Sequence, residues 1–408
     1  MRRRNFLKTL LTLPVVGGGM MFRNPLSLEW NQAVAGPGQK PILIVIFQRG
    51  GNDGLNTVVP FGDPRYRELR PNIAIGEPGT AGGAIDLDGF FGLHPALSPM
   101  NTLYQMGELA LFPAVHYPDA TRSHFEIQKL LEGGATSLQK DGWLNRYLAA
   151  SPGDALLRAG AFQQAIFSLQ GEVTVPVVDA STSNAWKGSA NHDEQILRDI
   201  YTQSRQEKLF QNMEQASQAG LETLELLQDL DPSAYKPSEG ITYPATRFGR
   251  NLKRLAQLIK AQMGLEIAAI DIGGWDTHVR QGGHEGNHAN RLAEYASGIT
   301  AFYLDLMLER ENILILTMTD FGRTARENGN QGTDHGNAAT WMALGGRVRG
   351  GIHGIWPGLQ EDQLHLGRYL AHTIDFRDIL GEILDRHLQA ASPATILKGY
   401  KYQPVGFL

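Results

Sequence analysis

Acidic and histidine side chains follow three apolar runs of the sequence, each within a few residues of the end of the run. Carboxylate and imidazole groups are the ligands expected for Zn²⁺, Mn²⁺ or Mg²⁺ where no thiolate is available, and this chain of 408 residues contains no Cys. Each residue alone fits a turn or a helix cap equally well. Their conjunction predicts one shared divalent metal site. In chain order they are Asp53 after 41–47, Asp276 and His278 after 266–272, Asp320 after 312–318, and then His335 in a Gly-rich stretch.

Ser123 is the candidate nucleophile. The pattern from Ser123 to Glu132 is helical, so Ser123 is expected at a helix N-terminus, where free amides and the helix dipole favour an anion. A nearby metal would lower the pKa of its hydroxyl. Glu126, three residues on, fits a capping box, in which Ser123 is only the helix cap. The residues alone leave both readings open.

Several nearby cations and histidines could complete such a site. Arg122 and Arg323 could hold an oxyanion by bidentate hydrogen bonds, and Arg49 lies close to Asp53 in the sequence. Each could equally pair with a surface acid. His124 and His116 could line the site.

The elements that must position these residues alternate between strands and helices. The runs 41–47, 109–115, 266–272 and 312–318 are mostly apolar and predict strands, whereas 123–132, 244–264, 291–309 and 376–388 have helical spacing. This alternation predicts an α/β fold with a parallel sheet. Right-handed connections bring the carboxyl ends of parallel strands to one edge, where ligands bind.

Residues 1–35 are predicted to be a cleaved twin-arginine export signal. Arg2, Arg3 and Arg4 precede a short apolar stretch, and Ala33-Val34-Ala35 is typical of a cleavage site. The alternative is an N-terminal membrane anchor. Cleavage removes five basic residues and one acidic residue, so the net charge of −5 becomes −9. We therefore expect a periplasmic or secreted protein that meets the twin-arginine translocase during export.

Composition limits what the remaining chain can be. With 42% hydrophobic and 19% charged residues it is globular, and its acidic balance argues against a nucleic-acid partner. No later segment is long and apolar enough for a stable membrane span. P-loop, dinucleotide and Gly-x-Ser-x-Gly motifs are absent. We expect one domain over 36–408, with a mainly helical insertion around 135–245.

Five motifs, in this order, resemble the exported family catalogued as domain of unknown function 1501. The resemblance covers nearly the whole mature chain and implies an alkaline phosphatase-like and sulfatase-like fold: a three-layer α/β/α sandwich with a mostly parallel central sheet and a two-metal site at the strand ends. The motifs are Arg49-Gly-Gly-Asn-Asp-Gly-Leu-Asn56, Arg122-Ser-His-Phe125, Gly274-Trp-Asp-Thr-His278, Thr319-Asp-Phe-Gly-Arg-Thr324 and Asp334-His-Gly-Asn337.

The resemblance also implies roles for residues. One ion would be bound by Asp276, His278 and His335. The second would be bound by Asp53, Asp320 and the nucleophile Ser123, with His124 or Asn52 filling a remaining position. Phe321 stands where the superfamily has a histidine, which favours one ion or a harder ion such as Mg²⁺ or Ca²⁺. Phe125 and Ile127 occupy the positions where a formylglycine sulfatase needs Pro and Arg, so that mechanism does not fit.

These observations predict an exported metal-dependent hydrolase of a small anionic phosphate or sulfate ester. Ser123 would be the nucleophile, and Arg122 or Arg323 would neutralise the non-bridging oxygens. The alternative is a non-catalytic exported protein that binds a metal or a polysaccharide, or serves in envelope assembly. A metal-dependent phosphotransferase or mutase is a third reading.

Overall fold

The computed structural model describes residues 40–118, 120–151, 153, 155, 157–178 and 234–408. The expected export signal and residues 179–233, about half of the expected insertion, therefore lie outside the described residues. None of the helices in the described part of the chain is both long and apolar enough to cross a bilayer.

A nine-stranded, mostly parallel sheet forms the centre of the described chain, in the order β11-β5-β10-β9-β1-β8-β6-β7, with β12 also paired to β5. Only β10 runs against its neighbours, β5 and β9. A second, small sheet has the order β2-β4-β3. The strands are β1 (Ile42–Gln48), β2 (Val58–Val59), β3 (Ile85–Asp86), β4 (Gly92–Leu93), β5 (Leu109–His116), β6 (Ala159–Phe162), β7 (Val177–Val178), β8 (Ile267–Ile272), β9 (Ile313–Thr319), β10 (Ala339–Gly345), β11 (Gly351–Ile352) and β12 (Ile374–Asp375).

Strand β1 lies between β8 and β9 and shows why the sheet is buried on both faces. Val45 is level with Ala269 of β8 and Leu316 of β9. Alternate side chains of β1 enter two different apolar clusters, with Val45 in one and Ile44 in the other. A continuous apolar run is the pattern expected of a parallel strand covered on both sides.

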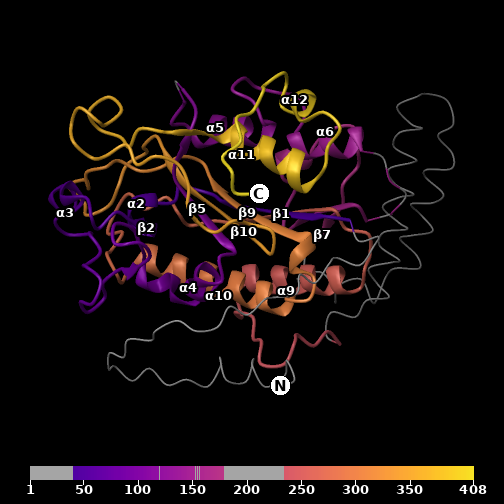
Figure 1. Ribbon diagram of the computed structural model, residues 1–408, viewed down its shortest axis with the longest axis horizontal. Coiled ribbons are helices and arrows are strands. Elements are labelled where there is room, and N and C mark those ends of the chain that lie inside the picture. Colours follow the sequence, from indigo (N-terminus) through magenta and orange to yellow (C-terminus); the bar gives the residue numbers. More distant parts are fainter. Residues whose placement is uncertain (1–39, 119, 152, 154, 156, 179–233) are drawn as a thin grey trace.

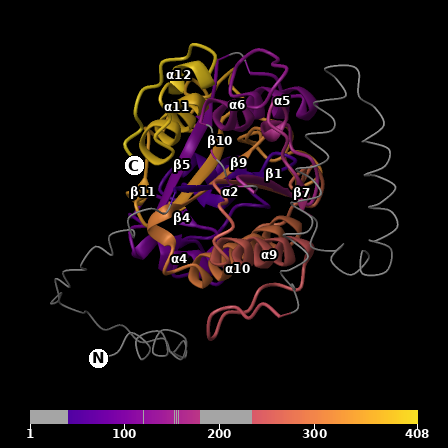
Figure 2. The same cartoon turned by 90° about the vertical axis from the view of Figure 1, so that its right-hand side faces the viewer.

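Helices cover both faces of this sheet (Figures 1 and 2). One layer holds α5, α6, α11 and α12, and the opposite layer holds α4, α9 and α10. The helices are α2 (Gly54–Thr57), α3 (Pro64–Leu69), α4 (Ser98–Gln105), α5 (His124–Gly133), α6 (Trp143–Ala150), α9 (Arg247–Lys260), α10 (Asn287–Asp305), α11 (Phe376–Glu382) and α12 (Pro393–Ile396), with shorter turns η1 (Pro95–Leu97), η2 (Phe167–Leu169), η5 (Arg310–Asn312) and the π-helical η6 (Ile383–His387).

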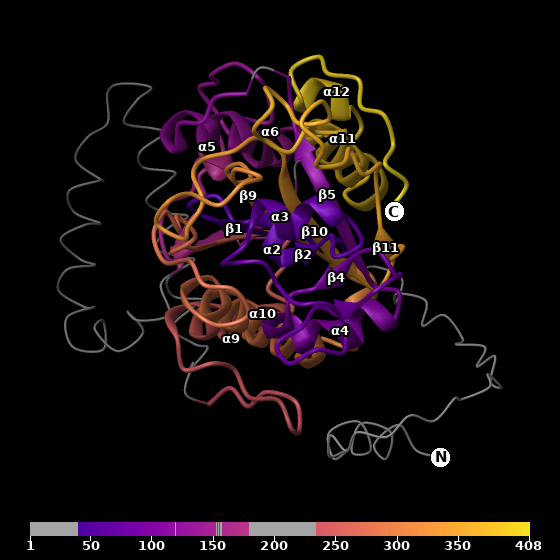
Figure 3. The ribbon, with the colours of Figure 1, turned by 90° about the vertical axis from the view of Figure 1, so that its left-hand side faces the viewer.

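The three-layer α/β/α architecture with a mostly parallel sheet confirms the predicted fold class. Figure 3 views the end of the molecule where the short helices α2 and α3 lie, beyond the exit of β1. The four predicted strands and four predicted helices form, with shifted ends; the last helix continues as η6.

Two features differ from the sequence-based expectation. The strand β10 was not expected, and it fills the space between β5 and β9. The region 135–245 is not wholly an insertion, because its strand β6 pairs with β8 and so belongs to the central sheet. This placement explains the apolar character of β6, whose four residues are all buried.

Candidate active site

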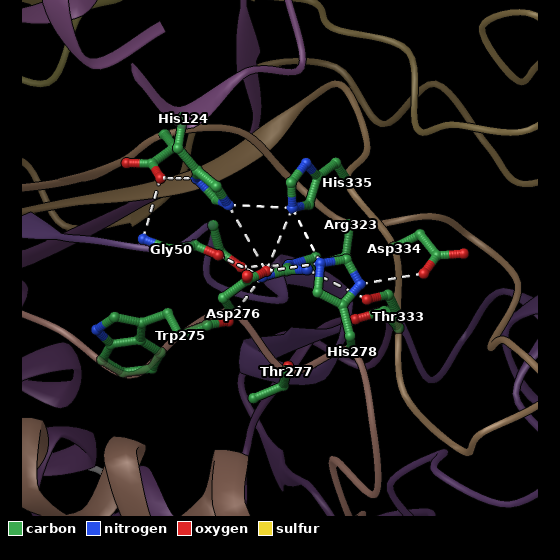
Figure 4. Close-up of polar contacts among 12 residues, drawn as sticks. Gly50, His124, Trp275, Asp276, Thr277, His278, Arg323, Thr333, Asp334 and His335 are labelled. Atoms are coloured by element: carbon green, nitrogen blue, oxygen red, sulfur yellow. Dashed lines mark hydrogen bonds and ion pairs between the residues drawn. The ribbon is translucent and has the colours of Figure 1, made fainter. Parts of the chain in front are cut away.

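Four side chains from three separate segments converge beyond the carboxyl ends of the parallel strands (Figure 4). His124 begins helix α5, Asp276 and His278 lie in the loop after β8, and His335 lies in the loop before β10. Because β1, β8 and β9 are adjacent and parallel, their exits meet at one edge of the sheet. The structure thus brings together four of the six residues predicted as metal ligands.

The potential ligand atoms of His124, Asp276 and His335 all lie within 4.8 Å of one another, and that of His278 adjoins two of them. The Nε2 atom of His335 lies 3.0 Å from Nε2 of His124 and 3.0 Å from Nε2 of His278. Oδ1 of Asp276 lies 3.0 Å from Nε2 of His278, 3.3 Å from Nε2 of His335 and 3.6 Å from Nε2 of His124. We call these four residues the His/Asp cluster.

Each histidine of the cluster is held from behind through its other ring nitrogen. Nδ1 of His335 donates to the carbonyl oxygen of Arg122 at 2.9 Å, and Nδ1 of His278 donates to Oδ1 of Asp334 at 3.1 Å. Nδ1 of His124 donates to Oδ2 of Asp320. A carbonyl or carboxylate oxygen only accepts, so these partners assign the ring proton to Nδ1.

The cluster therefore fits a divalent cation. With the proton on Nδ1, the neutral imidazoles of His124 and His335 direct their Nε2 lone pairs, and Asp276 a carboxylate oxygen, into one group of ligand atoms that all lie within 4.8 Å of one another, and His278 adjoins this group through His335 and Asp276. These groups repel one another unless a proton or a metal ion lies among them. Metal-bound histidines in proteins almost always donate their second nitrogen to a carboxylate or a carbonyl oxygen, as all three do here.

Asp320 acts through His124 in this arrangement. It is buried, and its carboxylate also accepts from the backbone N–H of Gly50 at 3.0 Å and from the side chain of Gln128 at 3.2 Å. Asp320 thus reaches the cluster, but as the partner of a histidine.

The histidine pKa values reflect these contacts. Burial lowers the pKa of His124, but the hydrogen bond and charge of Asp320 outweigh it, so the net shift is upwards. Burial lowers the pKa of His335, and the nearby His124 and Arg323 add to that effect. A proton entering the cluster is therefore expected on His124 rather than on His335.

Arg323 joins Asp276 of the cluster to the backbone of the surrounding loops. It is buried, and its guanidinium donates to the carbonyl oxygens of Gly51 at 2.6 Å, Thr333 at 3.1 Å and Trp275 at 2.9 Å, to that of Gly50, and to Oδ1 of Asp276 at 2.7 Å. Burial raises the pKa of Asp276, but the hydrogen bond and charge of Arg323 outweigh it and lower the pKa. These bonds use the donors of Arg323, so it positions Asp276 and the strand exits instead of reaching an ester oxygen.

Phe321 supports the histidines from the core. Its side chain is fully buried, and its ring centroid lies 4.6 Å from the rings of both His124 and His335. The backbone of Gly51 approaches this ring closely: its φ is +74°, and a Cβ there would lie 2.9 Å from the ring. Phe321 therefore offers the two histidines a packing surface and no ligand atom for a metal ion.

Ser123 precedes His124 at the start of α5, and the predicted capping box does not form. The side chain of Ser123 makes no cap hydrogen bond, and Glu126 instead accepts from the hydroxyl of Thr121 at 3.0 Å. Ser123 is exposed and directly precedes His124 of the cluster. Its neighbour Arg122 is also exposed, and its guanidinium lies 4.8 Å from the ring centroid of Tyr369.

Asp53 is not part of the cluster. Its carboxylate accepts from Arg70 at 2.5 and 2.9 Å and from Gln281 at 2.6 Å, and the side chains of Asp53 and Arg70 are both fully buried. Burial raises the pKa of Asp53, but the charge and hydrogen bonds of Arg70 outweigh it and lower the pKa. The expectation that Asp53 is a ligand is corrected here, because its oxygens are already satisfied by a buried guanidinium.

Arg49 and Asn52 are also used elsewhere. The guanidinium of Arg49 pairs with Glu132 and Asp271, and the side chain of Asn52 bonds to Gln48 at 2.8 Å and to Thr57 at 2.8 Å.

The sequence did not predict the role of Asp334, which accepts a hydrogen bond from His278. The only signal for it was an acid directly before a predicted ligand, His335.

Comparisons with known proteins identify the family of the chain and several solved structures of similar fold. The search among curated proteins found no match. Among solved structures, the chain is similar to the C-terminal periplasmic domain of EcEptC from Escherichia coli, with a TM-score of 0.37 and 10% identity over 90% of this chain and 89% of that one. It is also similar to the phosphonate monoester hydrolase of Agrobacterium radiobacter, with a TM-score of 0.35 and 12% identity over 90% and 79% of the two chains. The model of the family described as "Protein of unknown function (DUF1501)" matches residues 92–399, three quarters of the sequence, and the chain belongs to that family.

Proposed function

We propose that this protein is a metal-dependent hydrolase of phosphate or sulfate esters. The observation that supports this most is the His/Asp cluster, in which the ligand atoms of His124, Asp276 and His335 lie within 4.8 Å of one another, His278 adjoins them, and every histidine is held by an acceptor behind it. Three imidazoles and one carboxylate suit Zn²⁺ best, and Mn²⁺ less well. Because Asp53 is paired with Arg70 and Asp320 with His124, we propose a single ion.

A divalent ion held there would act as a Lewis acid, lowering the pKa of a nearby hydroxyl and balancing the charge of an ester group. The residues of the chain position the ligand groups. Arg323 fixes Asp276, while Asp320, Asp334 and the carbonyl of Arg122 fix the tautomer and the direction of the imidazoles. The free N–H groups at the start of α5 favour an anion beside Ser123.

In this proposal the Ser123 hydroxyl loses its proton to water, and its oxygen bonds to the phosphorus or sulfur atom of the ester. The bond from that atom to the leaving oxygen breaks, and the leaving alkoxide takes a proton from water. A second water molecule then attacks the serine ester, releases phosphate or sulfate and restores the hydroxyl. Arg122 is the exposed cation next to Ser123, and we propose that it binds the non-bridging oxygens.

The test measures bound metal and turnover on the same preparation. Purified protein is analysed for metals and assayed with a phosphomonoester, a phosphodiester and a sulfate ester, beside Ser123→Ala and the exposed control Ser137→Ala. We expect about one ion per chain in all three, and turnover only in the wild type and the control. A metal-free, inactive wild type would overturn the proposal. Bound metal without turnover would favour the non-catalytic binding protein.

We also propose that residues 1–35 direct export through the twin-arginine translocase. This rests on the sequence Arg2-Arg3-Arg4 before an apolar stretch. Cell fractionation of the wild type and of a variant with all three arginines changed to lysine tests it. Export of the variant at the wild-type level would overturn the proposal.

A further inference from the structure

A pocket of about 460 Å³ lies next to the His/Asp cluster and is not explained by it. Asp334 and Asn328 form part of its wall. The same Asp334 carboxylate accepts from His278 of the cluster at 3.1 Å, so Asp334 connects the pocket wall to the cluster (Figure 4). A substrate whose ester group lies at the cluster would have its other end within reach of this pocket.

Three arginines line the pocket, and they are only weakly neutralised. Arg65 pairs with Glu68, but both side chains are partly exposed, so the pair is weak. Arg368 lies 3.5 Å from Asp334 and is 58% exposed. Among the residues that the structure describes, Arg326 forms no ion pair. These guanidinium groups remain available to an incoming anion.

Carboxylates also line the pocket, but two of the three already have donors. Glu327 accepts from the backbone N–H groups of Asn72 and Ile73, both at 3.0 Å, and from the side chain of Asn72. Asp334 accepts from Asn328 at 3.0 Å as well as from His278. The third, Glu361, is exposed at the rim. The lone pairs that would repel an anion are therefore largely occupied by protein donors.

A row of cations leads from Ser123 to the pocket. Arg122 and Arg368 lie over the ring of the same residue, Tyr369, at 4.8 and 5.6 Å from its centroid. Arg122 adjoins the proposed nucleophile, and Arg368 lies in the pocket wall. An extended anion could therefore contact guanidinium groups along its whole length.

We propose that this pocket binds a second anionic group of the substrate. This rests on the proposed function and names its substrate class: an ester whose non-reacting end carries another phosphate, sulfate or carboxylate. Arg326 and Arg368 would recognise that group, and Leu69 and Leu364 in the same wall would pack against the carbon skeleton between the two anions.

Binding without turnover tests the inference. The probes are glucose 1,6-bisphosphate and glucose 6-phosphate, titrated by calorimetry into metal-loaded Ser123→Ala protein. We expect the bisphosphate to bind about tenfold more tightly, as one added charge-assisted contact allows. Adding Arg326→Gln and Arg368→Gln should reduce the preference to about twofold or less without changing the monophosphate affinity. The control is Arg386→Gln, an exposed arginine that pairs with its neighbour Asp385.

Equal binding of the two probes, or a preference that survives the double substitution, would overturn the inference. Thermal unfolding of each variant shows whether it has folded, and the single variant Arg326→Gln, which breaks no ion pair of the described residues, keeps the test valid if the double variant has not. An inactive wild type that still prefers the bisphosphate through these arginines would reject the hydrolase proposal and keep the pocket. An active enzyme that shows no preference for the bisphosphate would keep the hydrolase proposal and reject the proposed role of the pocket.

Discussion

Asp320 and Asp334 each stand behind a histidine of the cluster. Their carboxylates fix the tautomer and direction of His124 and His278. Residue type alone does not separate this role from metal ligation, because an aspartate can do either. For that reason Asp276 and Asp320 were indistinguishable in the sequence, and only the hydrogen bond from His124 separates them.

The substitution Asp320→Asn should weaken metal binding about 10- to 100-fold while the protein stays folded. An amide at this position can offer its nitrogen to His124, which turns the ring proton towards the cluster. Competition with a chromophoric chelator measures the affinity. The matched control is Asp362→Asn at an exposed position. Equal affinities for Asp320→Asn and the control would contradict the role assigned to Asp320.

At the scale of elements, the exit of β1 is held by two buried arginines. Arg323 binds the carbonyl oxygens of Gly50 and Gly51, and Arg70 binds the carboxylate of Asp53. Both cations come from other segments of the chain, so they order the loop before any ligand arrives. The Asp53–Arg70 pair also has both partners fully buried, which makes the loss of one partner costly.

We expect Asp53→Asn to lower the free energy of unfolding by about 3–5 kcal/mol, because it leaves the Arg70 charge buried without its counterion. The bound metal per folded chain should stay at the wild-type level. Denaturant unfolding and metal analysis measure the two quantities. The comparison variant Glu68→Gln breaks the partly exposed pair with Arg65 and should cost at most about 1 kcal/mol. Loss of metal without loss of stability would make Asp53 a ligand after all.

The central strands β1, β8 and β9 could be predicted from the sequence, whereas the neighbouring strand β10 could not. β1 and β9 are rich in Ile, Leu and Val, and β8 consists of Ile and Ala apart from Asp271; a parallel sheet buried on both faces needs such mostly apolar strands. β10 contains Thr340 and ends at Gly345, so its sequence carries a weaker signal, and its antiparallel direction depends on the space between β5 and β9. The sequence predicted which loops meet, but the contacts of Asp53 and Arg323 depend on packing across more than one strand.

The whole molecule contains several histidines that burial keeps neutral. Burial lowers the pKa of His116 and His288 from 6.5 to about 3, and that of His94 and His387 to about 4. His116 lies in β5, and its buried Nε2 atom has no hydrogen-bond partner. These rings belong to the core, which is why His116 does not line the site.

These shifts predict that stability falls as the pH drops below about 6.5 towards 4. In that window the unfolded chain binds protons that the folded chain does not, so each such histidine adds up to about 1.4 kcal/mol per pH unit to the slope. Above 6.5 their contribution is constant. Denaturant unfolding of chelator-treated protein between pH 4.5 and 6.5 measures the slope. His116→Gln should reduce this slope by an amount that corresponds to the uptake of about one proton fewer on unfolding. The exposed control His284→Gln should leave the slope unchanged. A slope unchanged by His116→Gln would show that this ring titrates normally.

The ligand atoms of the cluster are scattered along the chain, with His124 and His335 separated by 211 positions. Short fragments cannot bring these atoms together, and an unfolded chain does so only at a high entropic cost. An ion at the cluster would therefore bind the finished fold and link the layer of α5 to the loop before β10. Such selective binding raises stability by about 2.7 kcal/mol when the free ion is at one hundred times its dissociation constant. Resistance to heat and to proteolysis would then increase with the concentration of free metal in the surroundings. The amount of bound ion would equal the number of chains that have completed folding.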